Sequence, residues 1–218
     1  MAQRRRTARD RRRSLGQHFL VDQDVVRALV SSLDLQPGEL VVDVGAGTGA
    51  LTLPLARAGA KVLAVERDRD TLRRLQTAVE REGLASRVQL RRADLRQLPW
   101  PRQPFRVVAN PPFALTSALL GRLFDDPVRG PTRADLLLDW GVVRRRTATP
   151  ADTLRSAAWA PWWRFSAGTK VPREAFRPPP SVDTGWLVVE RRDPPILPEE
   201  LAGVFRDAIA PTWQRLRG

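Results

Sequence analysis

A glycine-rich turn directly after a short apolar run is the feature that most restricts the fold of this chain. Residues 40–44 are Leu-Val-Val-Asp-Val, which is typical of a buried strand, and Gly45-Ala46-Gly47-Thr48-Gly49 follows at once. Glycines at alternate positions let the backbone turn sharply into a helix and approach a ligand closely. A helical pattern from Leu51 and a second apolar run over 61–65 complete a strand–helix–strand unit. Such a unit predicts a doubly wound α/β fold with a mostly parallel sheet.

The same alternation of strands and helices continues along the chain. Apolar periodicity predicts further helices over 23–34, 68–82 and 114–124, a basic helical stretch over 141–159, and strands over 87–91, 105–109 and 134–140. Residues 162–167 and 185–190 alternate like a terminal pair of strands, so we expect an antiparallel strand at the end of the sheet. The proline-rich segment 171–183 between them is expected to be irregular. One short helix is predicted over 197–210.

These patterns divide the chain into three parts. Residues 1–13 are expected to form a basic, flexible arm, 14–193 a Rossmann-like domain, and 194–218 a short helical remnant. A length of 218 residues suffices for one α/β domain with a small appendage. The chain starts with a charge run rather than an apolar signal segment, and no apolar run approaches membrane-spanning length. We therefore expect a cytoplasmic protein that does not contact a membrane.

The charge of the chain favours a polyanionic partner. Lys and Arg outnumber Asp and Glu by 37 to 24, which gives a formal net charge of +13 and a pI of about 11.6. Nucleic acid is the first expected partner, and an acidic membrane surface is the second. The arm contains seven arginines: Arg4, Arg5, Arg6, Arg9, Arg11, Arg12 and Arg13. We expect this arm to lie along phosphates, and a solubilising tail is the alternative.

Missing residue types exclude several kinds of chemistry. The chain has no cysteine, so disulfides, thiolate nucleophiles and cysteine-bound zinc are excluded. His18 is the only histidine, which also excludes Ser-His-Asp catalysis and histidine metal clusters. We therefore expect a function that uses no metal.

Acidic residues follow two of the predicted parallel strands. Glu66 ends the strand after the glycine turn, and Asp94 follows the next strand. The carboxyl ends of parallel strands meet at one edge of the sheet, where such folds bind ligands. Glu66 is placed to accept hydrogen bonds from both hydroxyls of a ribose, and Asp94 from an adenine amino group. The alternative is that the glycines only form a turn and that both acids only cap helices.

The predicted strand over 105–109 stops abruptly at Asn110-Pro111-Pro112-Phe113. Proline cannot continue a sheet ladder, so the amide and the ring are expected on a stiff loop at the same edge of the sheet. An amide, exposed carbonyls and a ring held together are suited to gripping a flat heterocycle that bears an amine. A common turn with a core phenylalanine is the alternative. The cofactor-type loop in the same sheet favours the catalytic interpretation.

Taken in order, these segments resemble a known family. Asp43-Val-Gly-Ala-Gly-Thr-Gly49, Glu66, Asp94 and Asn110-Pro-Pro-Phe113 are similar to the motifs of S-adenosylmethionine-dependent methyltransferases that act on exocyclic amines. The resemblance covers about residues 14–190. It implies a Rossmann-like methyltransferase fold and S-adenosyl-L-methionine as the cofactor.

In such an enzyme the catalytic residues would be Asn110, Pro111 and Phe113. An adenine N6 amine is a poor nucleophile because its lone pair is delocalised into the ring. Acceptors at the Asn110 side chain and the Pro111 backbone carbonyl would make the nitrogen more pyramidal and direct its lone pair at the methyl group. Phe113 would stack on the base once the base has left its helix or loop. No strong base is required, since the nitrogen becomes acidic after it takes the methyl group.

Two further segments resemble the rRNA adenine-N6 dimethyltransferases. Residues 15–20, Leu-Gly-Gln-His-Phe-Leu, are similar to their Gln-Asn-Phe-Leu segment, and 171–182 to their Val-Pro-x-x-x-Phe-x-Pro-x-Pro-x-Val segment. In the second segment Arg173, Phe176 and Arg177 are expected to contact RNA. The resemblance is closer to the Erm-type enzymes, which methylate one adenine of 23S rRNA. This implies a monomer that acts on 23S rRNA before full ribosome assembly, and resistance to macrolide, lincosamide and streptogramin B antibiotics.

The cofactor contacts of that family correspond here to Gln17, His18, Leu20, Gly45, Gly47, Glu66, Asp94 and Asn110. The chain departs from the family pattern in three places. His18 replaces the usual asparagine, and Asn-Pro-Pro-Phe replaces the commoner Asn-Ile/Leu-Pro-Tyr/Phe. Only about twenty residues follow Pro195, so the C-terminal helical part of the fold is expected to be much reduced.

Three alternative functions stay open. The chain could be a housekeeping 16S rRNA adenine dimethyltransferase of the same family. It could be an adenine-N6 DNA methylase, which is disfavoured because no separate target-recognition domain is visible. It could also be a non-catalytic RNA-binding or ribosome-assembly factor on the same scaffold, since His18 and the short C-terminal part leave room for that function.

Overall fold

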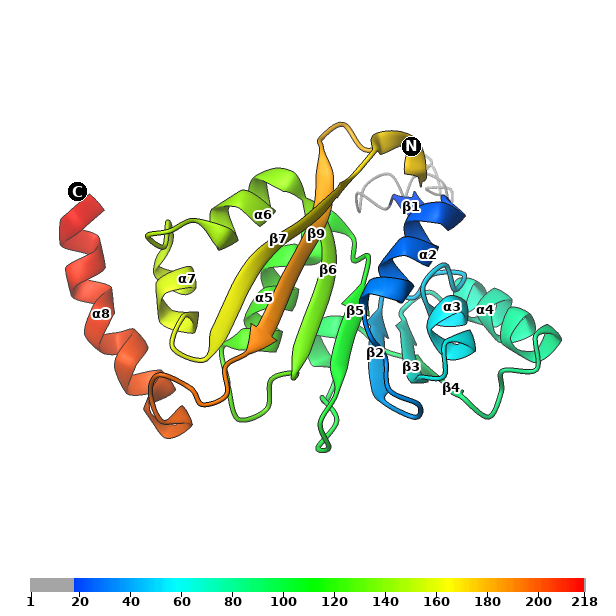
Figure 1. Cartoon of the computed structure of the whole chain (residues 1–218), viewed down its shortest axis with the longest axis horizontal. Coiled ribbons are helices and arrows are strands. Elements are labelled where there is room, and N and C mark those ends of the chain that lie inside the picture. Colours follow the sequence, from blue (N-terminus) through cyan, green and yellow to red (C-terminus); the bar gives the residue numbers. More distant parts are fainter. Residues whose placement is uncertain (1–17, 218) are drawn as a thin grey trace, which may run out of the picture.

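The computed structural model of the chain describes residues 18–217 (Figure 1). The predicted arm and the predicted cofactor residue Gln17 lie outside this range. At the centre is a seven-stranded sheet in the order β4-β3-β2-β5-β6-β9-β7. Its strands are β2 (Leu40–Val44), β3 (Lys61–Glu66), β4 (Val88–Arg92), β5 (Arg106–Ala109), β6 (Arg133–Asp139), β7 (Trp163–Val171) and β9 (Thr184–Arg191).

The strand directions confirm the predicted fold class. Strands β2 to β6 pair in parallel, whereas β9 runs antiparallel to both of its neighbours, β6 and β7. This is a Rossmann-like, mostly parallel sheet. Its antiparallel strand, β9, lies second from the edge rather than at the end of the sheet, because β7 pairs with its outer side. The chain builds outward from β2 through β3 and β4, and then returns to place β5 on the other side of β2. Open α/β sheets form their ligand crevice at such a switch point, beside the carboxyl ends of the strands.

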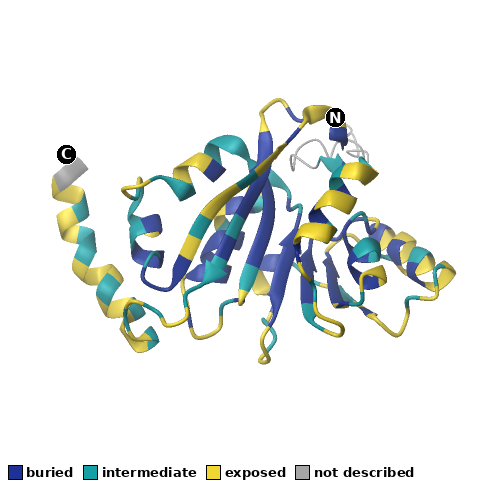
Figure 2. Cartoon of the chain, viewed as in Figure 1, coloured by how far each residue is buried: buried dark blue, intermediate teal, exposed yellow. Residues whose placement is uncertain are grey.

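Helices cover both faces of the sheet (Figure 1). One face is covered by α2 (Gln23–Ser32), α3 (Thr52–Arg57) and α4 (Arg69–Arg81), and the other by α5 (Thr116–Phe124), α6 (Trp140–Thr147) and α7 (Leu154–Trp159). Because side chains alternate along a strand, Val41 joins one core cluster and Val42 the other. The central strands are therefore buried on both sides (Figure 2), as their continuous apolar sequences predict.

The basic stretch 141–159, predicted as one helix, contains a break. Helix α6 ends at Thr147 and α7 begins at Leu154. Pro150 lies between them, where it lacks a backbone donor and disfavours a helical conformation of the residue before it. Thr153 then caps α7, because its hydroxyl accepts a hydrogen bond from the Ser156 backbone N–H at 3.1 Å.

The proline-rich segment 171–183 is more regular than predicted. A 3₁₀ turn over Arg173–Ala175 leads into a two-residue strand, β8 (Phe176–Arg177). This strand pairs antiparallel with β1 (Phe19–Leu20). The small β1–β8 sheet ties the segment before α2 to the loop after β7. Two segments that are far apart in the sequence are thereby held side by side.

Helix α8 (Ala202–Arg217) closes the described chain after a 3₁₀ turn over Glu199–Leu201. It falls within the predicted helical remnant but runs past the predicted end at residue 210. Pro211 inside it removes one helical hydrogen bond, in a helix that is exposed over most of its length (Figure 2). None of the described helices is long and apolar enough to cross a membrane.

Candidate active site

A cavity of about 1000 Å³ opens at the carboxyl ends of β2, β3, β4 and β5. Its lining includes every predicted cofactor residue within the described range: His18, Leu20, Gly45, Gly47, Glu66, Asp94 and Asn110. A second cavity, of about 260 Å³, lies between α5, α7 and α8. None of the predicted cofactor residues lines this second cavity. Among residues 18–217 no cluster of His, Cys, Asp or Glu is suited to hold a metal ion. The larger cavity is therefore the candidate cofactor site.

The glycine turn forms one wall of this cavity. Gly45, Gly47 and Gly49 have φ angles of 78°, 56° and 100°, in the left-handed region that favours glycine. A Cβ atom at Gly49 would also lie 2.6 Å from Leu75 Cδ1 of α4. Glycine is thus required at Gly49 both by the backbone conformation and by the close approach of the helix.

Glu66 organises the backbone around the cavity. Its Oε2 accepts a hydrogen bond from the Gly47 backbone N–H at 3.1 Å, and its Oε1 accepts from the N–H groups of Arg67 and Asp68 at 2.7 and 2.8 Å. A carboxylate offers about four acceptor positions, so this arrangement leaves Oε2 room for one further donor. The predicted contact with a ribose fits one hydroxyl more easily than two.

Asp94 also lines the cavity, but arginines surround its carboxylate. Arg96 donates from Nε to Oδ1 at 3.0 Å and from Nη2 to Oδ2 at 2.6 Å, and Arg67 Nη1 reaches Oδ2 at 3.5 Å. These cations, Arg96 above all, hold the pKa of Asp94 well below its usual range. Asp94 Oδ1 additionally accepts from the Arg96 backbone N–H and caps the 3₁₀ turn Leu95–Gln97. Asp94 thus caps a helical turn, as the alternative interpretation predicted, and also lines the cavity.

Asp43 is a buried acid that sequence reasoning placed in the motif but gave no role. Burial raises its pKa from 3.8 to about 7, and the negative charge of Glu66 adds to this effect. The Thr52 hydroxyl donates to Asp43 Oδ2 at 2.6 Å, which partly offsets the rise. The sequence indicates such a buried carboxyl, because Asp43 is the one acid in an otherwise apolar strand. Asp43 is therefore mostly protonated below neutral pH.

Replacing Asp43 with asparagine is expected to change how stability depends on pH. Between its ordinary pKa of 3.8 and about 7, Asp43 loses its proton in the unfolded chain but keeps it in the folded chain. Rising pH therefore favours unfolding over this window, by up to about 4 kcal/mol in total. The asparagine variant lacks this term, so it should match the wild type near about pH 4 and exceed it near about pH 8. Urea unfolding at both pH values measures the difference, and a constant offset between the two proteins would contradict the assignment.

The amide of Asn110 has a defined orientation. Its Nδ2 donates to the His18 backbone carbonyl at 2.8 Å. A carbonyl can only accept, so the nitrogen must face His18 and the Asn110 Oδ1 is the atom left for another donor. Within the described chain, neither Oδ1 nor the carbonyl of Pro111 accepts a hydrogen bond. Of the two acceptors predicted for an exocyclic amine, Asn110 lines the cavity, whereas Pro111 is buried and is not among the residues that line it.

His18 connects the catalytic loop with the loop after β7. Its ring lies 5.4 Å from the Phe113 ring at an interplanar angle of 42°, and its Nδ1 is 2.8 Å from the Pro178 carbonyl oxygen. Phe113 is half-buried and starts the 3₁₀ turn Phe113–Leu115. The departure from the usual asparagine therefore adds a contact with the predicted base-stacking ring, while His18 still lines the cofactor cavity.

The predicted RNA contacts of the loop after β7 separate into two kinds. Arg173 and Arg177 are exposed, although each also donates to backbone carbonyls of its own loop. Phe176 is fully buried, because its pairing with Leu20 turns the ring into the core beside Trp186. Phe176 thus presents no surface to RNA, and we assign it to the core instead.

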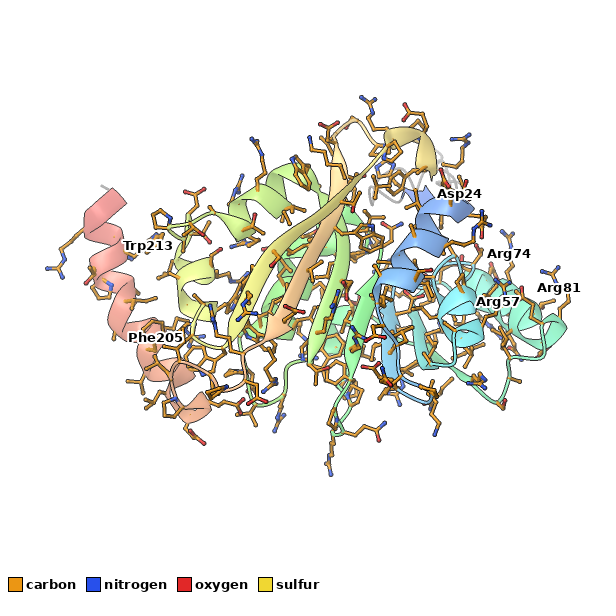
Figure 3. All side chains as sticks on the ribbon, in the orientation of Figure 1. Asp24, Arg57, Arg74, Arg81, Phe205 and Trp213 are labelled. Carbon is orange, nitrogen blue, oxygen red and sulfur yellow. The ribbon has the colours of Figure 1, made fainter. Side chains whose placement is uncertain are left out.

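Further exposed cations, which were not singled out from the sequence, lie on α6 and on the edge strand β7. They are Arg144 and Arg145 of α6 and Arg164 and Lys170 of the edge strand β7. Lys170 Nζ lies 5.0 Å from the centre of the Trp140 ring. The basic composition of 141–159 was the available signal. Positive charge is not restricted to this side, since exposed arginines such as Arg74 and Arg81 also project from α4 (Figure 3).

The sequence matches the family of ribosomal RNA adenine dimethylases over residues 8–211. It is 36% identical over 194 residues to an rRNA adenine N-6-methyltransferase of Corynebacterium diphtheriae, covering 89% of this chain and 74% of that protein. It is 35% identical over 198 residues to the mycinamicin-resistance protein MyrB of Micromonospora griseorubida, covering 91% and 61%. Ribosomal RNA small subunit methyltransferase A of Synechococcus sp. (strain RCC307) is 34% identical over 223 residues, with 94% and 80% covered.

The fold is similar to that of a solved rRNA methyltransferase. The crystal structure of the 23S rRNA methyltransferase ErmE matches with a TM-score of 0.77 and 24% identity, over 88% of this chain and 77% of that one. At this identity the likeness shows the shared fold. The chain spans only 61% of the length of MyrB, so the activity of that whole protein does not transfer by similarity alone.

Proposed function

Because the chain belongs to the ribosomal RNA adenine dimethylase family, we propose that it transfers a methyl group from S-adenosyl-L-methionine to N6 of a specific adenine in 23S rRNA. The observation that carries this proposal is the position of Asn110. It lines the same cavity as Glu66 and Asp94, and its side-chain oxygen is available to a donor. A methyl donor and an exocyclic amine can therefore meet at a single loop.

The residues of the cavity fit the adenosine part of the cofactor. Glu66 and Asp94 offer carboxylate oxygens to hydroxyl and amine donors, and the glycine turn brings backbone close to the ligand. Gly45, Gly47, Glu66 and Asp94 would hold the cofactor, and Leu20 lines the same cavity. When bound, S-adenosylmethionine supplies a methyl group activated by a positively charged sulfur.

The chain's own part in catalysis is alignment. Asn110 Oδ1 and the Pro111 carbonyl would accept the two N6 hydrogens and so expose the nitrogen lone pair to the methyl group. Phe113 would hold the plane of the flipped base by stacking. His18 keeps both groups in place, since its carbonyl fixes the Asn110 amide and its ring contacts Phe113.

Charge and similarity support an rRNA substrate. The net charge of +13 and the exposed cations of α6, β7 and the loop after β7 suit a polyanion. The names of MyrB and ErmE connect related proteins with resistance to mycinamicin and with 23S rRNA. We accordingly propose a cytoplasmic monomer that acts on 23S rRNA before full ribosome assembly and gives macrolide, lincosamide and streptogramin B resistance.

Mapping rRNA methylation in cells that express the protein tests this function. Primer extension on 16S and 23S rRNA should show one modified adenine in 23S rRNA, and drug susceptibility should fall in parallel. Cells expressing an Asn110→Ala variant are the control for effects of expression alone. Absence of modification at every 23S adenine would overturn the proposal.

A small-subunit rRNA adenine dimethyltransferase is the second candidate function. It is favoured by the relative in Synechococcus, of which this chain covers 80%. Modification confined to 16S rRNA in the same experiment would select it. Failure of the purified protein to bind S-adenosylmethionine would instead favour a non-catalytic RNA-binding factor, and transfer to duplex DNA alone would favour a DNA methylase.

Deleting residues 1–13 is expected to reduce the salt dependence of RNA binding. Each phosphate contact that is lost lowers the slope of log affinity against log salt by about 0.7 to 0.9, and the arm carries seven arginines. Filter binding of an rRNA fragment at several salt concentrations measures the slope. An unchanged slope would mean that the arm is a solubilising tail.

A further inference from the structure

Every acceptor position of the Asp94 carboxylate is already occupied within the folded chain. Oδ1 accepts from the backbone N–H and the Nε of Arg96, both at 3.0 Å. Oδ2 accepts from Arg96 Nη2 at 2.6 Å and from Arg67 Nη1 at 3.5 Å. A carboxylate offers about four such positions. An adenine amino group that binds Asp94 must therefore displace one of these donors.

The contact from Arg67 is the one that can yield. The two arginine side chains are about equally exposed, 58% for Arg67 and 56% for Arg96. Arg67 makes only one long hydrogen bond to Asp94, so its guanidinium can turn into water at little cost. Arg96 instead grips both oxygens with a guanidinium fork and adds its own backbone N–H. Such forked, charge-assisted pairs are the stronger and more directional ones. Releasing the Arg96 guanidinium would give up two contacts to gain one.

We propose that the two arginines act on Asp94 in opposite ways. Arg96 is a positioning residue that holds the carboxylate in the orientation needed to accept the adenine amino group of the cofactor. Arg67 is a competitor that occupies the Oδ2 position which the amino group takes. This inference rests on the proposed cofactor and adds a control on its affinity.

The position of Arg67 strengthens this division of roles. Its backbone N–H donates to Glu66 Oε1 at 2.7 Å, so its main chain is fixed beside the ribose contact while its side chain reaches across to Asp94. Both arginines carry one positive charge near the same carboxylate, with pair distances of 2.6 and 3.5 Å. A purely electrostatic influence would give both substitutions the same sign. Opposite signs would identify the geometry of the contacts as the cause.

Calorimetry with S-adenosylhomocysteine tests the proposal on the full-length protein. This probe keeps the adenosine and lacks the sulfonium, so it has no net charge at neutral pH, and removing an arginine changes the net charge–charge attraction to the ligand little. Arg96→Ala should weaken binding about fivefold to tenfold. Arg67→Ala should tighten it about twofold to fivefold, the range of an exposed ion pair. Arg96→Lys should also bind more weakly than the wild type, because lysine keeps the charge but cannot form the fork.

Two controls separate the proposed roles from general effects. Arg74→Ala removes the same charge from the exposed side of α4, where Arg74 neither lines the cavity nor contacts Asp94 among the described residues, and should change affinity by less than about twofold. S-inosylhomocysteine carries a ring carbonyl in place of the amine, so the gain in Arg67→Ala should vanish with this probe. Thermal unfolding midpoints close to that of the wild type exclude loss of folding.

The possible results are distinct. Weaker binding of S-adenosylhomocysteine to Arg67→Ala would overturn the competitor role and make Arg67 a supporting contact. Unchanged binding to Arg96→Ala would overturn the positioning role. If the wild type itself does not bind the probe, the proposed function fails and this inference fails with it. Wild-type binding with the wrong signs in the variants refutes the inference alone.

Discussion

Replacing Asn110 with alanine is expected to lower the methylation rate by about 10²- to 10³-fold, the usual effect of removing one preorganised polar group from a reacting centre. The side-chain oxygen of Asn110 is the acceptor that would make the adenine nitrogen nucleophilic. Cofactor affinity should change much less, because the proposed cofactor contacts Glu66 and Asp94 line the cavity from other strands. Single-turnover methylation of an rRNA fragment measures the rate, and calorimetry measures the cofactor affinity of the same protein.

An Asn110→Asp variant is the matched control for orientation. It keeps an oxygen at the position of Oδ1 but replaces Nδ2 with a second oxygen, which would then face the His18 carbonyl at the present 2.8 Å separation. Two acceptors repel, so the side chain should turn away and activity should fall as well. Recovery of activity in the aspartate variant would show that the anchor to His18 is dispensable. Undiminished activity of the alanine variant would remove Asn110 from catalysis altogether.

The strand ends of the site were predictable because their placement follows from the pattern of the chain alone. Buried strands of a βαβ unit run parallel, so their carboxyl ends must share one edge of the sheet. Glu66 ends such a strand, Asp94 and Asn110 each follow one, and all three line the cavity. To predict that these residues meet, it was enough to locate the parallel strands and to note which residue stands at the end of each. The glycine turn was equally predictable, because three glycines within five residues indicate a backbone with left-handed φ angles, as Gly45, Gly47 and Gly49 have.

Contacts between distant segments were not predictable in this way. Phe176 lies in a basic, proline-rich loop that suggests exposure, and a two-residue pairing with Leu20 turns it into the core. Two residues show no periodicity, so the β1–β8 pair left no trace in the sequence. The contact between His18 and Pro178 joins residues 160 positions apart. The contacts of Arg67 and Arg96 with Asp94 depend on the directions of the side chains, which the spacing of residues in the sequence does not determine.

Glu66 holds the backbone around the glycine turn and is the proposed contact for the ribose, so a glutamine at this position is expected to disturb both roles. The carboxylate is buried and accepts three backbone N–H groups with its two oxygens. Glutamine offers one oxygen, which can keep Arg67 and Asp68, but its amide group then faces the Gly47 N–H. A buried donor left without a partner costs about 1–3 kcal/mol of stability. Urea unfolding of Glu66→Gln should show a loss of this size.

The affinity of the Glu66→Gln variant for the cofactor should also fall, by more than its loss of folding stability can explain. In the glutamine variant the atom at the Oε2 position is a donor, so the hydroxyl of a ribose loses its acceptor along with the negative charge. Hydrogen bonds to charged groups contribute about 1.5–3 kcal/mol, which corresponds to about a 10- to 150-fold weaker affinity for S-adenosylhomocysteine in calorimetry. The displaced glycine turn would add to this loss.

Asp70→Asn provides the comparison that gives the Glu66 result its meaning. Asp70 lines the same cavity and loses the same charge, but its side chain is 76% exposed and pairs only loosely with Arg73 at 3.6 Å. We expect less than about 0.5 kcal/mol in stability and less than about a twofold change in affinity for this variant. If Glu66→Gln loses stability but binds S-adenosylhomocysteine like the wild type, Glu66 is an organiser of the glycine turn without a contact to the ribose. If the stability and the affinity of Glu66→Gln both fall while Asp70→Asn stays near the wild type, the buried carboxylate of Glu66 both stabilises the glycine turn and binds the ribose.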